Sequence, residues 1–180
     1  EGDGDVAAVM IEPIGSNSGK VPATGETLGQ LQEVTRRNGA LLIFDEVVTG
    51  FRVSPGGAQA HYGVVPDITA LAKIVAGGLP GGAVCGRKDI LDYLDFEVSK
   101  EAGREKVRHQ GTFNANPVSA AAGVAALEII KTGEPGARAA ATAKTVRAEL
   151  NRVLVEEGVP WAIYGEFSIF HIFTNPRKLA

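Results

Sequence analysis

The sequence predicts an α/β fold with a mostly parallel sheet flanked by helices. Three short apolar runs of strand length, at residues 6–11, 40–44 and 68–71, are separated by segments with helical periodicity or turn residues. The run at 40–44 is continuously apolar, which is typical of a strand buried on both faces of a parallel sheet. Strands and helices that alternate in this way form βαβ units, and ligands of such sheets gather beyond the carboxyl ends of the strands.

The segment between the first two strands has the features of an amphipathic helix. Thr24 is a suitable N-cap, and Leu28, Leu31 and Val34 are expected on one helical face. The basic pair at residues 36–37 followed by a glycine predicts the end of the helix. The second strand then begins at residue 40.

The rest of the chain continues the alternation and divides into two parts. We expect a large domain to cover 1–135, and a linking helix with the start of a C-terminal α+β small domain to cover 136–180. Asn116 with Pro117 marks a helix start. The further elements expected in order are a strand at 83–85, a short helix at 88–94, a polar loop at 99–110, and helices at 117–131 and 136–157.

Composition excludes several classes of protein. The 180 residues are 44% hydrophobic and 22% charged, which is ordinary for a globular protein, and the formal charge of −3 provides no positive field for nucleic acid. The longest apolar runs are far shorter than the roughly 20 residues that span a bilayer, and no leader is recognisable. The single cysteine, Cys85, is expected as a small core residue in a reducing compartment. We therefore expect a cytoplasmic protein without nucleic-acid or membrane partners.

The apolar run that ends in Asp45 and Glu46 has a first alternative interpretation as the magnesium-binding strand of a nucleotide hydrolase. That function needs a phosphate loop, and residues 15–21 have one residue too few between the glycines. Val21 also stands where Ser or Thr would bind the metal.

A phosphoacceptor domain is a second alternative, because such sheets also place an Asp and a Lys at neighbouring strand ends. These domains are complete at about 120 residues, within the usual size of a single domain. They carry an acidic pair at the first strand, where this sequence offers only Glu12 before a proline.

Several blocks of sequence, in order, support a third interpretation. The blocks are Phe-Asp-Glu-Val-Val-Thr-Gly-Phe-Arg at 44–52, Gly-Gly-Ala-Gln at 56–59, Tyr-Gly-Val-Val-Pro-Asp at 62–67, Leu-Ala-Lys-Ile-Val-Ala-Gly-Gly at 71–78 and Gly-Thr-Phe-Asn-Ala-Asn-Pro at 111–117. In order and spacing they resemble the class III, fold-type I aminotransferases, nearest to the glutamate-1-semialdehyde aminomutase-like branch. The resemblance covers nearly the whole chain and implies a pyridoxal 5'-phosphate (PLP) enzyme of which this sequence is a central to C-terminal fragment.

The resemblance assigns the two central roles to Asp45 and Lys73. PLP is an electron sink that is strongest when its pyridine nitrogen stays protonated, so a carboxylate beside that nitrogen is required, and Asp45 matches it. Lys73 matches the lysine that carries the cofactor as a Schiff base and later moves the substrate proton. Both jobs need a neutral amine for part of the cycle, which burial among neighbouring apolar side chains would favour.

Three further residues take roles from the same resemblance. Val47 matches the residue that packs on one face of the pyridine ring. Thr112 matches a threonine that binds the cofactor phosphate across a dimer interface, and Gly111 allows close approach. A homodimer is therefore implied, with Thr112 reaching the cofactor of the partner.

The implied reaction is transfer of an amino group between an amino acid or amine and a keto acid or aldehyde acceptor. Intramolecular transfer, as in glutamate-1-semialdehyde 2,1-aminomutase, is the alternative within the family. Gly81 and the block at 112–116 depart from the aminomutase pattern. The phosphate loop and the stacking aromatic of the family are not in this sequence, so an inactive PLP-fold scaffold is a third possibility, and we expect the 180 residues alone to be inactive.

Overall fold

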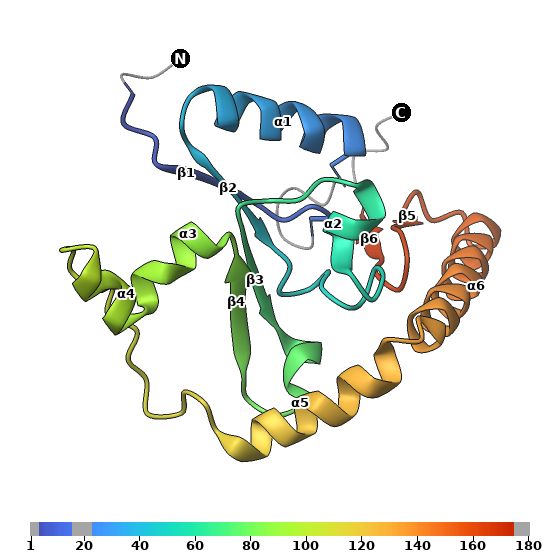
Figure 1. Ribbon diagram of the computed structural model, residues 1–180. Coiled ribbons are helices and arrows are strands. Elements are labelled where there is room, and N and C mark those ends of the chain that lie inside the picture. The colour runs from blue at the N-terminus through green and yellow to red at the C-terminus, as the bar shows by residue number, and fades with distance from the viewer. Residues whose placement is uncertain (1–3, 16–22, 175–180) are drawn as a thin grey trace.

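The computed structural model describes residues 4–15 and 23–174, and in this part of the chain it confirms the α/β fold with a mostly parallel sheet (Figure 1). The segment at 15–21 that was weighed as a phosphate loop lies, except for Gly15, outside the described residues. The elements in order are β1 (Ala8–Ile11), α1 (Gly25–Arg37), β2 (Leu41–Asp45), α2 (Gly57–Tyr62), β3 (Ile68–Ala72), η1 (Lys73–Ala76), β4 (Gly82–Gly86), α3 (Lys88–Leu91), η2 (Asp92–Leu94), α4 (Phe96–Glu101), α5 (Pro117–Ile130), α6 (Glu134–Glu156), β5 (Ala162–Tyr164) and β6 (His171–Phe173).

The larger sheet of the described part has the strand order β1-β2-β3-β4. β1 pairs with β2 and β2 with β3 in parallel, whereas β4 returns antiparallel to β3. The carboxyl ends of β2 and β3 therefore lie at the same edge of the sheet.

The core lies between this sheet and α1. Leu42 and Phe44 of β2 pack against Leu28 of α1 and Val64, and all four side chains are buried. The N-cap prediction is confirmed, because the Thr24 side chain accepts a hydrogen bond from the Thr27 amide. The predicted helical face is partly wrong: Val34 is 46% exposed, and Thr35 is buried in its place.

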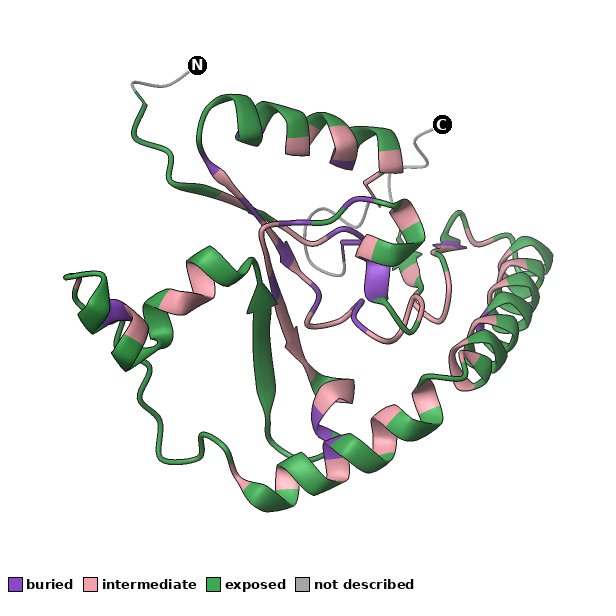
Figure 2. Ribbon diagram, in the orientation of Figure 1, coloured by how far each residue is buried: buried purple, intermediate pink, exposed green. Residues whose placement is uncertain are grey.

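Burial in β2 alternates instead of being continuous. Leu42 and Phe44 are buried, but Leu41 and Ile43 remain half-buried on the opposite face of the sheet. The expectation of burial on both faces is therefore not met in the described part. β4 is exposed along its whole length, which overturns the prediction that Cys85 is a core residue (Figure 2).

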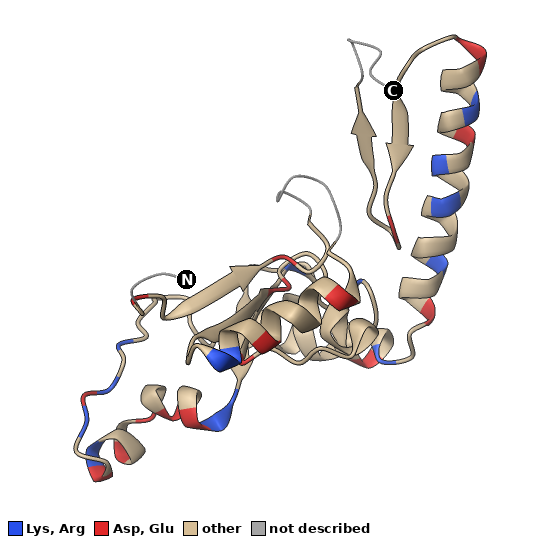
Figure 3. Cartoon of the chain, turned by 90° about the horizontal axis from the view of Figure 1, so that it is seen from above, with Lys and Arg blue, Asp and Glu red and all other residues tan. Residues whose placement is uncertain are grey.

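The C-terminal elements pack mainly against one another, and they contact α2 through Phe167, whose ring lies 4.9 Å from that of His61. α6 lies beside the antiparallel β5–β6 hairpin, away from the four-stranded sheet (Figure 3). Asn151 of α6 joins the two, since its side chain donates to the Ile163 carbonyl at 2.7 Å and accepts from the Ile163 amide at 2.9 Å. Within the described residues, no helix combines the length and apolar character needed to cross a membrane.

Helix α4 was not predicted from the sequence. Residues 99–110 were expected to form a polar loop, but the helix covers Phe96–Glu101. Its start is fixed by Asp95, whose side chain accepts from the Val98 amide at 3.1 Å. An Asp three residues before that amide is an N-cap signal that the sequence carries, and it was overlooked.

Candidate active site

Asp45 is the last residue of β2 and lies on the half-buried face of the sheet. Side chains alternate along a strand, so Asp45 points to the face opposite Phe44. Its Oδ1 accepts a hydrogen bond from the Val47 amide at 3.0 Å, which tightens the turn that follows β2. In the described part of the chain Oδ2 has no protein donor, so this carboxylate can accept a further hydrogen bond.

Lys73 follows directly after β3 and has an unusual backbone conformation. Its φ of 53° lies in the left-handed region, which costs a non-glycine residue free energy and persists only where the surrounding structure holds it in place. The expected burial is wrong: Lys73 is exposed, although Leu71, Ile74 and Val75 beside it are half-buried. Across the described residues the amine makes no hydrogen bond or ion pair.

The register of the sheet brings these two residues to the same edge. Asp45 is paired with Ala70 across parallel strands, and Lys73 follows Ala70 by three positions. Neighbouring strands lie about 4.8 Å apart. Asp45 and the turn that begins at Lys73 therefore lie at the carboxyl ends of adjacent strands.

The turn after Lys73 is packed directly against α5. A Cβ atom on Gly77 would lie 2.3 Å from the Ala122 carbonyl oxygen, and one on Gly123 would lie 2.4 Å from the Val75 carbonyl oxygen. Backbone therefore touches backbone, and only glycine fits at both positions. Through this contact, the position of Lys73 depends on the helix that follows the block at 111–117.

Gly111 and Thr112 make no hydrogen bond to Asp45 or Lys73 in the described part of the chain. Both are exposed in the loop that precedes α5, and no hydrogen bond of the described residues joins them to the strand ends. The loop turns tightly: Ala115 has a φ of 56°. This loop and the glycine-rich turn share a cavity of about 410 Å³, lined by Val75, Ala76, Pro80, Gly81, Gly82, His109, Phe113, Asn114, Ala115, Asn116, Ser119 and Ala120.

Glu46 is a residue of this region to which sequence reasoning gave no role. It is 0% exposed, and its carboxylate accepts hydrogen bonds from Thr49 Oγ1, from the amides of Ala58 and Gln59, and from Gln59 Nε2. The acidic pair at the end of β2 was visible in the sequence. Nothing in it distinguished the carboxylate that faces the site from the one that is buried behind it.

The thiol of Cys85 lies on the same face of the sheet as this buried carboxylate. Its Sγ is 3.8 Å from the Thr69 carbonyl oxygen, to which it donates. Partial desolvation, together with the negative charge of Glu46, raises the pKa of the Cys85 thiol above its ordinary value. Cys85 is therefore a weak nucleophile at neutral pH despite its exposure.

Comparison with known proteins places this geometry in a family. The model of the class III aminotransferases matches residues 1–172, which is nearly the whole chain. The protein therefore belongs to the class III aminotransferases, as the resemblance predicted.

Relatives and solved structures agree with this assignment. A glutamate-1-semialdehyde 2,1-aminomutase of Methanococcoides burtonii is 38% identical over 97% of this chain. An omega-transaminase from Sphaerobacter thermophilus has a TM-score of 0.80 at 40% identity over 92% of this chain, and a transaminase with PLP bound has a TM-score of 0.81 at 35% identity over 93%. The chain spans 40% of the aminomutase and 36% and 38% of the two transaminases.

Proposed function

We propose that this protein transfers an amino group between an amino acid or amine and a keto acid or aldehyde, with PLP as its cofactor. The observation that carries the proposal is the placement of Asp45 and Lys73 at the carboxyl ends of two neighbouring parallel strands. A free carboxylate oxygen and a free amine at that edge suit PLP, which needs one of each. The family membership supports the same conclusion.

Each site residue has a separate task in this proposal. Bound PLP supplies an electron sink for the charge that develops at the substrate α-carbon. Asp45 would accept a hydrogen bond from the protonated pyridine nitrogen, and Val47 would lie beside the ring. Lys73 would hold the cofactor through its amine and, when that amine is free, would move the proton between the substrate α-carbon and the cofactor carbon.

Gly111 and Thr112 serve a second subunit in this proposal. Both are exposed, and they make no hydrogen bond to Asp45 or Lys73 in the described part of the chain. A homodimer in which Thr112 donates to the cofactor phosphate of the partner would account for the exposure of Thr112 and for its lack of contact with Asp45 and Lys73. We also propose that residues 1–135 belong to the cofactor-binding domain and that residues 136–180 begin the small domain. The packing of α6 against β5, which pairs with β6, supports this division.

The test is an absorption spectrum of the full-length protein with added PLP, before and after borohydride. We expect a borohydride-sensitive band in the wild type and in Lys144→Ala, an exposed lysine of α6, and no such band in Lys73→Ala. A band that survives in Lys73→Ala would overturn the assignment of Lys73. A folded wild type without any band would leave a PLP-fold scaffold that has lost its chemistry.

Intramolecular amino transfer is the second candidate. It is favoured by the identity of 38–50% to relatives that are named glutamate-1-semialdehyde 2,1-aminomutase. An aminomutase needs no second substrate, whereas an aminotransferase stops after one half-reaction unless a keto acid is present. Turnover of glutamate semialdehyde without added keto acid therefore separates the two.

A further inference from the structure

The buried carboxylate of Glu46 connects the two strands that carry the proposed cofactor residues. Glu46 lies between Asp45 and Val47 in sequence, but its side chain is turned into the protein. The Glu46 amide also donates to the Ala70 carbonyl of β3 at 2.9 Å. The residue therefore belongs to the turn at the end of β2 and contacts the neighbouring strand directly.

The carboxylate is held by donors from α2 and from Thr49 in the turn after β2. Oε2 accepts from the Ala58 amide at 2.6 Å and from Thr49 Oγ1 at 3.0 Å, while Oε1 accepts from the amide and the side chain of Gln59, both at 3.2 Å. A buried carboxylate with four donors has a single favourable position, because any shift leaves a donor unsatisfied.

The packing around this carboxylate leaves no room for adjustment. A Cβ atom on Gly57 would lie 2.5 Å from Oε2 and 2.7 Å from Oε1. Gly57 also has a φ of 72°, which other residues rarely adopt. The backbone at the start of α2 therefore lies in direct contact with the Glu46 carboxylate, which only a glycine at position 57 permits.

Gln59 continues the connection to the strand that precedes Lys73. Its Nε2 donates to Thr69 Oγ1 at 3.2 Å as well as to Glu46. Thr69 is buried on β3, four positions before Lys73. Hydrogen bonds therefore connect the turn after β2 to β3. They run from Glu46 to Gln59 and from Gln59 to Thr69, and all three side chains are buried or half-buried.

We propose that Glu46 and Gln59 are positioning residues, which set the distance between Asp45 and Lys73 and so hold the cofactor site in register. This inference rests on the proposed function, because it assigns the spacing of two residues that bind PLP. It predicts that loss of the hydrogen bonds between Glu46, Gln59 and Thr69 weakens PLP binding more than it lowers stability. The reason is that a ligand bound by both Asp45 and Lys73 is sensitive to a small change in the distance between them.

The test uses Gln59→Met and Thr69→Val in the full-length protein, with Gln32→Met as the matched control. Gln32 Nε2 donates to the Val65 carbonyl at 2.6 Å, on α1 and away from the Asp45 edge of the sheet, so the control removes a comparable hydrogen bond. The measurements are the melting temperature without cofactor, the dissociation constant for PLP, and the pH midpoint of the borohydride-sensitive band.

For Gln59→Met we expect a PLP dissociation constant raised about tenfold, corresponding to about 1.4 kcal/mol, together with a shifted pH midpoint. Thr69→Val should act in the same direction, and the double variant should be no worse than the stronger single one, because both interrupt one link. Gln32→Met should change the melting temperature alone.

Equal effects of Gln59→Met and Gln32→Met on the dissociation constant and on the band would overturn the inference and leave Glu46 and Gln59 a general folding role. A Gln59→Met protein that binds PLP as the wild type does would also overturn it. Failure of the proposed function is distinguishable, because the wild type itself would then show no borohydride-sensitive band, and the inference would fall with it.

Discussion

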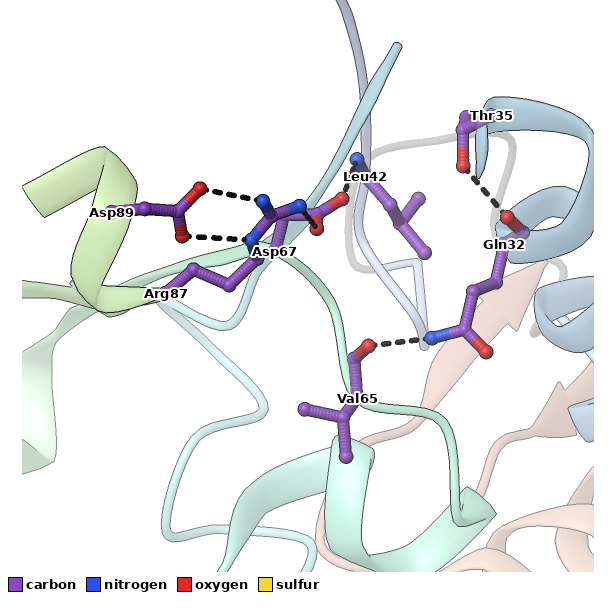
Figure 4. A network of polar contacts seen from close by, with 7 residues as sticks. All are labelled: Gln32, Thr35, Leu42, Val65, Asp67, Arg87 and Asp89. Atoms are coloured by element: carbon purple, nitrogen blue, oxygen red, sulfur yellow. Dashed lines mark hydrogen bonds and ion pairs between the residues drawn. The ribbon is translucent and has the colours of Figure 1, made fainter. Parts of the chain in front are cut away.

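Asp67 and Leu42 are joined by two hydrogen bonds, one through the backbone of Asp67 and one through its side chain. The Asp67 amide donates to the Leu42 carbonyl at 2.9 Å, and the Leu42 amide donates to Asp67 Oδ2 at 2.8 Å (Figure 4). Asp67 directly precedes β3, and Lys73 directly follows it. This pair therefore fixes the register of β3 against β2 at the end opposite the candidate site.

Replacement of Asp67 by Ala should destabilise the protein by roughly 1–3 kcal/mol, because the amide of the buried Leu42 loses its acceptor. The measurement is the free energy of unfolding from a urea titration. Asp67→Asn, which keeps one acceptor oxygen, should lose less. Equal losses in the two variants would contradict the role of the carboxylate as the acceptor for Leu42.

The exposed pair of Arg87 and Asp89 should contribute to stability in a pH-dependent way. Arg87 donates to both oxygens of Asp89 at 3.0 and 2.6 Å, and this hydrogen bonding lowers the pKa of the Asp89 carboxyl below its ordinary value. A lowered pKa in the folded state stabilises the fold above the unfolded pKa of about 3.9, and the contribution is lost as the pH falls through the lower folded value.

A double-mutant cycle with Arg87→Met and Asp89→Asn measures this coupling in urea. We expect a small favourable coupling at about pH 7 that declines as the pH falls below about 4, and that weakens in high salt because both groups are exposed. Coupling of the same size at low and neutral pH would show that the two side chains interact without the charge of Asp89.

Two glycines of similar backbone conformation should respond differently to alanine. Gly57 and Gly63 have φ values of 72° and 68°, so Ala costs each about 1–2 kcal/mol in backbone strain. At Gly57 the new Cβ also meets the fixed Glu46 carboxylate, which adds about 1–3 kcal/mol, whereas at Gly63 it meets no atom within 4 Å. Equal losses of unfolding free energy in the two variants would indicate that the carboxylate moves aside.

Helical glycines offer a second matched comparison. Gly29 of α1 has open space around its Cβ position, so Gly29→Ala should stabilise the protein by about 0.5–1 kcal/mol. Gly123→Ala in α5 should instead destabilise it by about 1–3 kcal/mol, because the new Cβ meets the Val75 carbonyl. Since this contact supports the turn after Lys73, Gly123→Ala should also weaken PLP binding, as measured by titration, while Gly29→Ala should not.

Local signals predicted much of the fold correctly. Thr24 and Asn116 carry side-chain oxygens that cap α1 and α5 in the way that their positions indicated. The apolar runs at 40–44 and 68–71 predict strands because a short apolar run bounded by turn residues is typical of a buried strand. Helix α4 also has a local signal, because Asp95 caps it, although the charged residues that follow are typical of a loop.

Exposure was predicted less well than secondary structure. Val34, Lys73 and Cys85 were all expected inside and lie outside. Helical periodicity does not define which of two adjacent residues faces the core. Thr35 can be buried in α1 because its hydroxyl donates to the Leu31 carbonyl within the helix. Burial at a strand end depends on which other elements cover that end. The residues next to it in the sequence do not indicate which elements these are.

The sequence by itself determined the order of strands and helices, the helix starts and the motif blocks of the family, because these depend on residues within a few positions of one another. Only the tertiary structure decided that Asp45 and Lys73 share one edge in a defined register, that Lys73 takes a left-handed conformation, and that Glu46 is buried against Gly57 and Gln59. These features arise from contacts between segments that are distant in the chain, where burial and hydrogen bonding outweigh local preference.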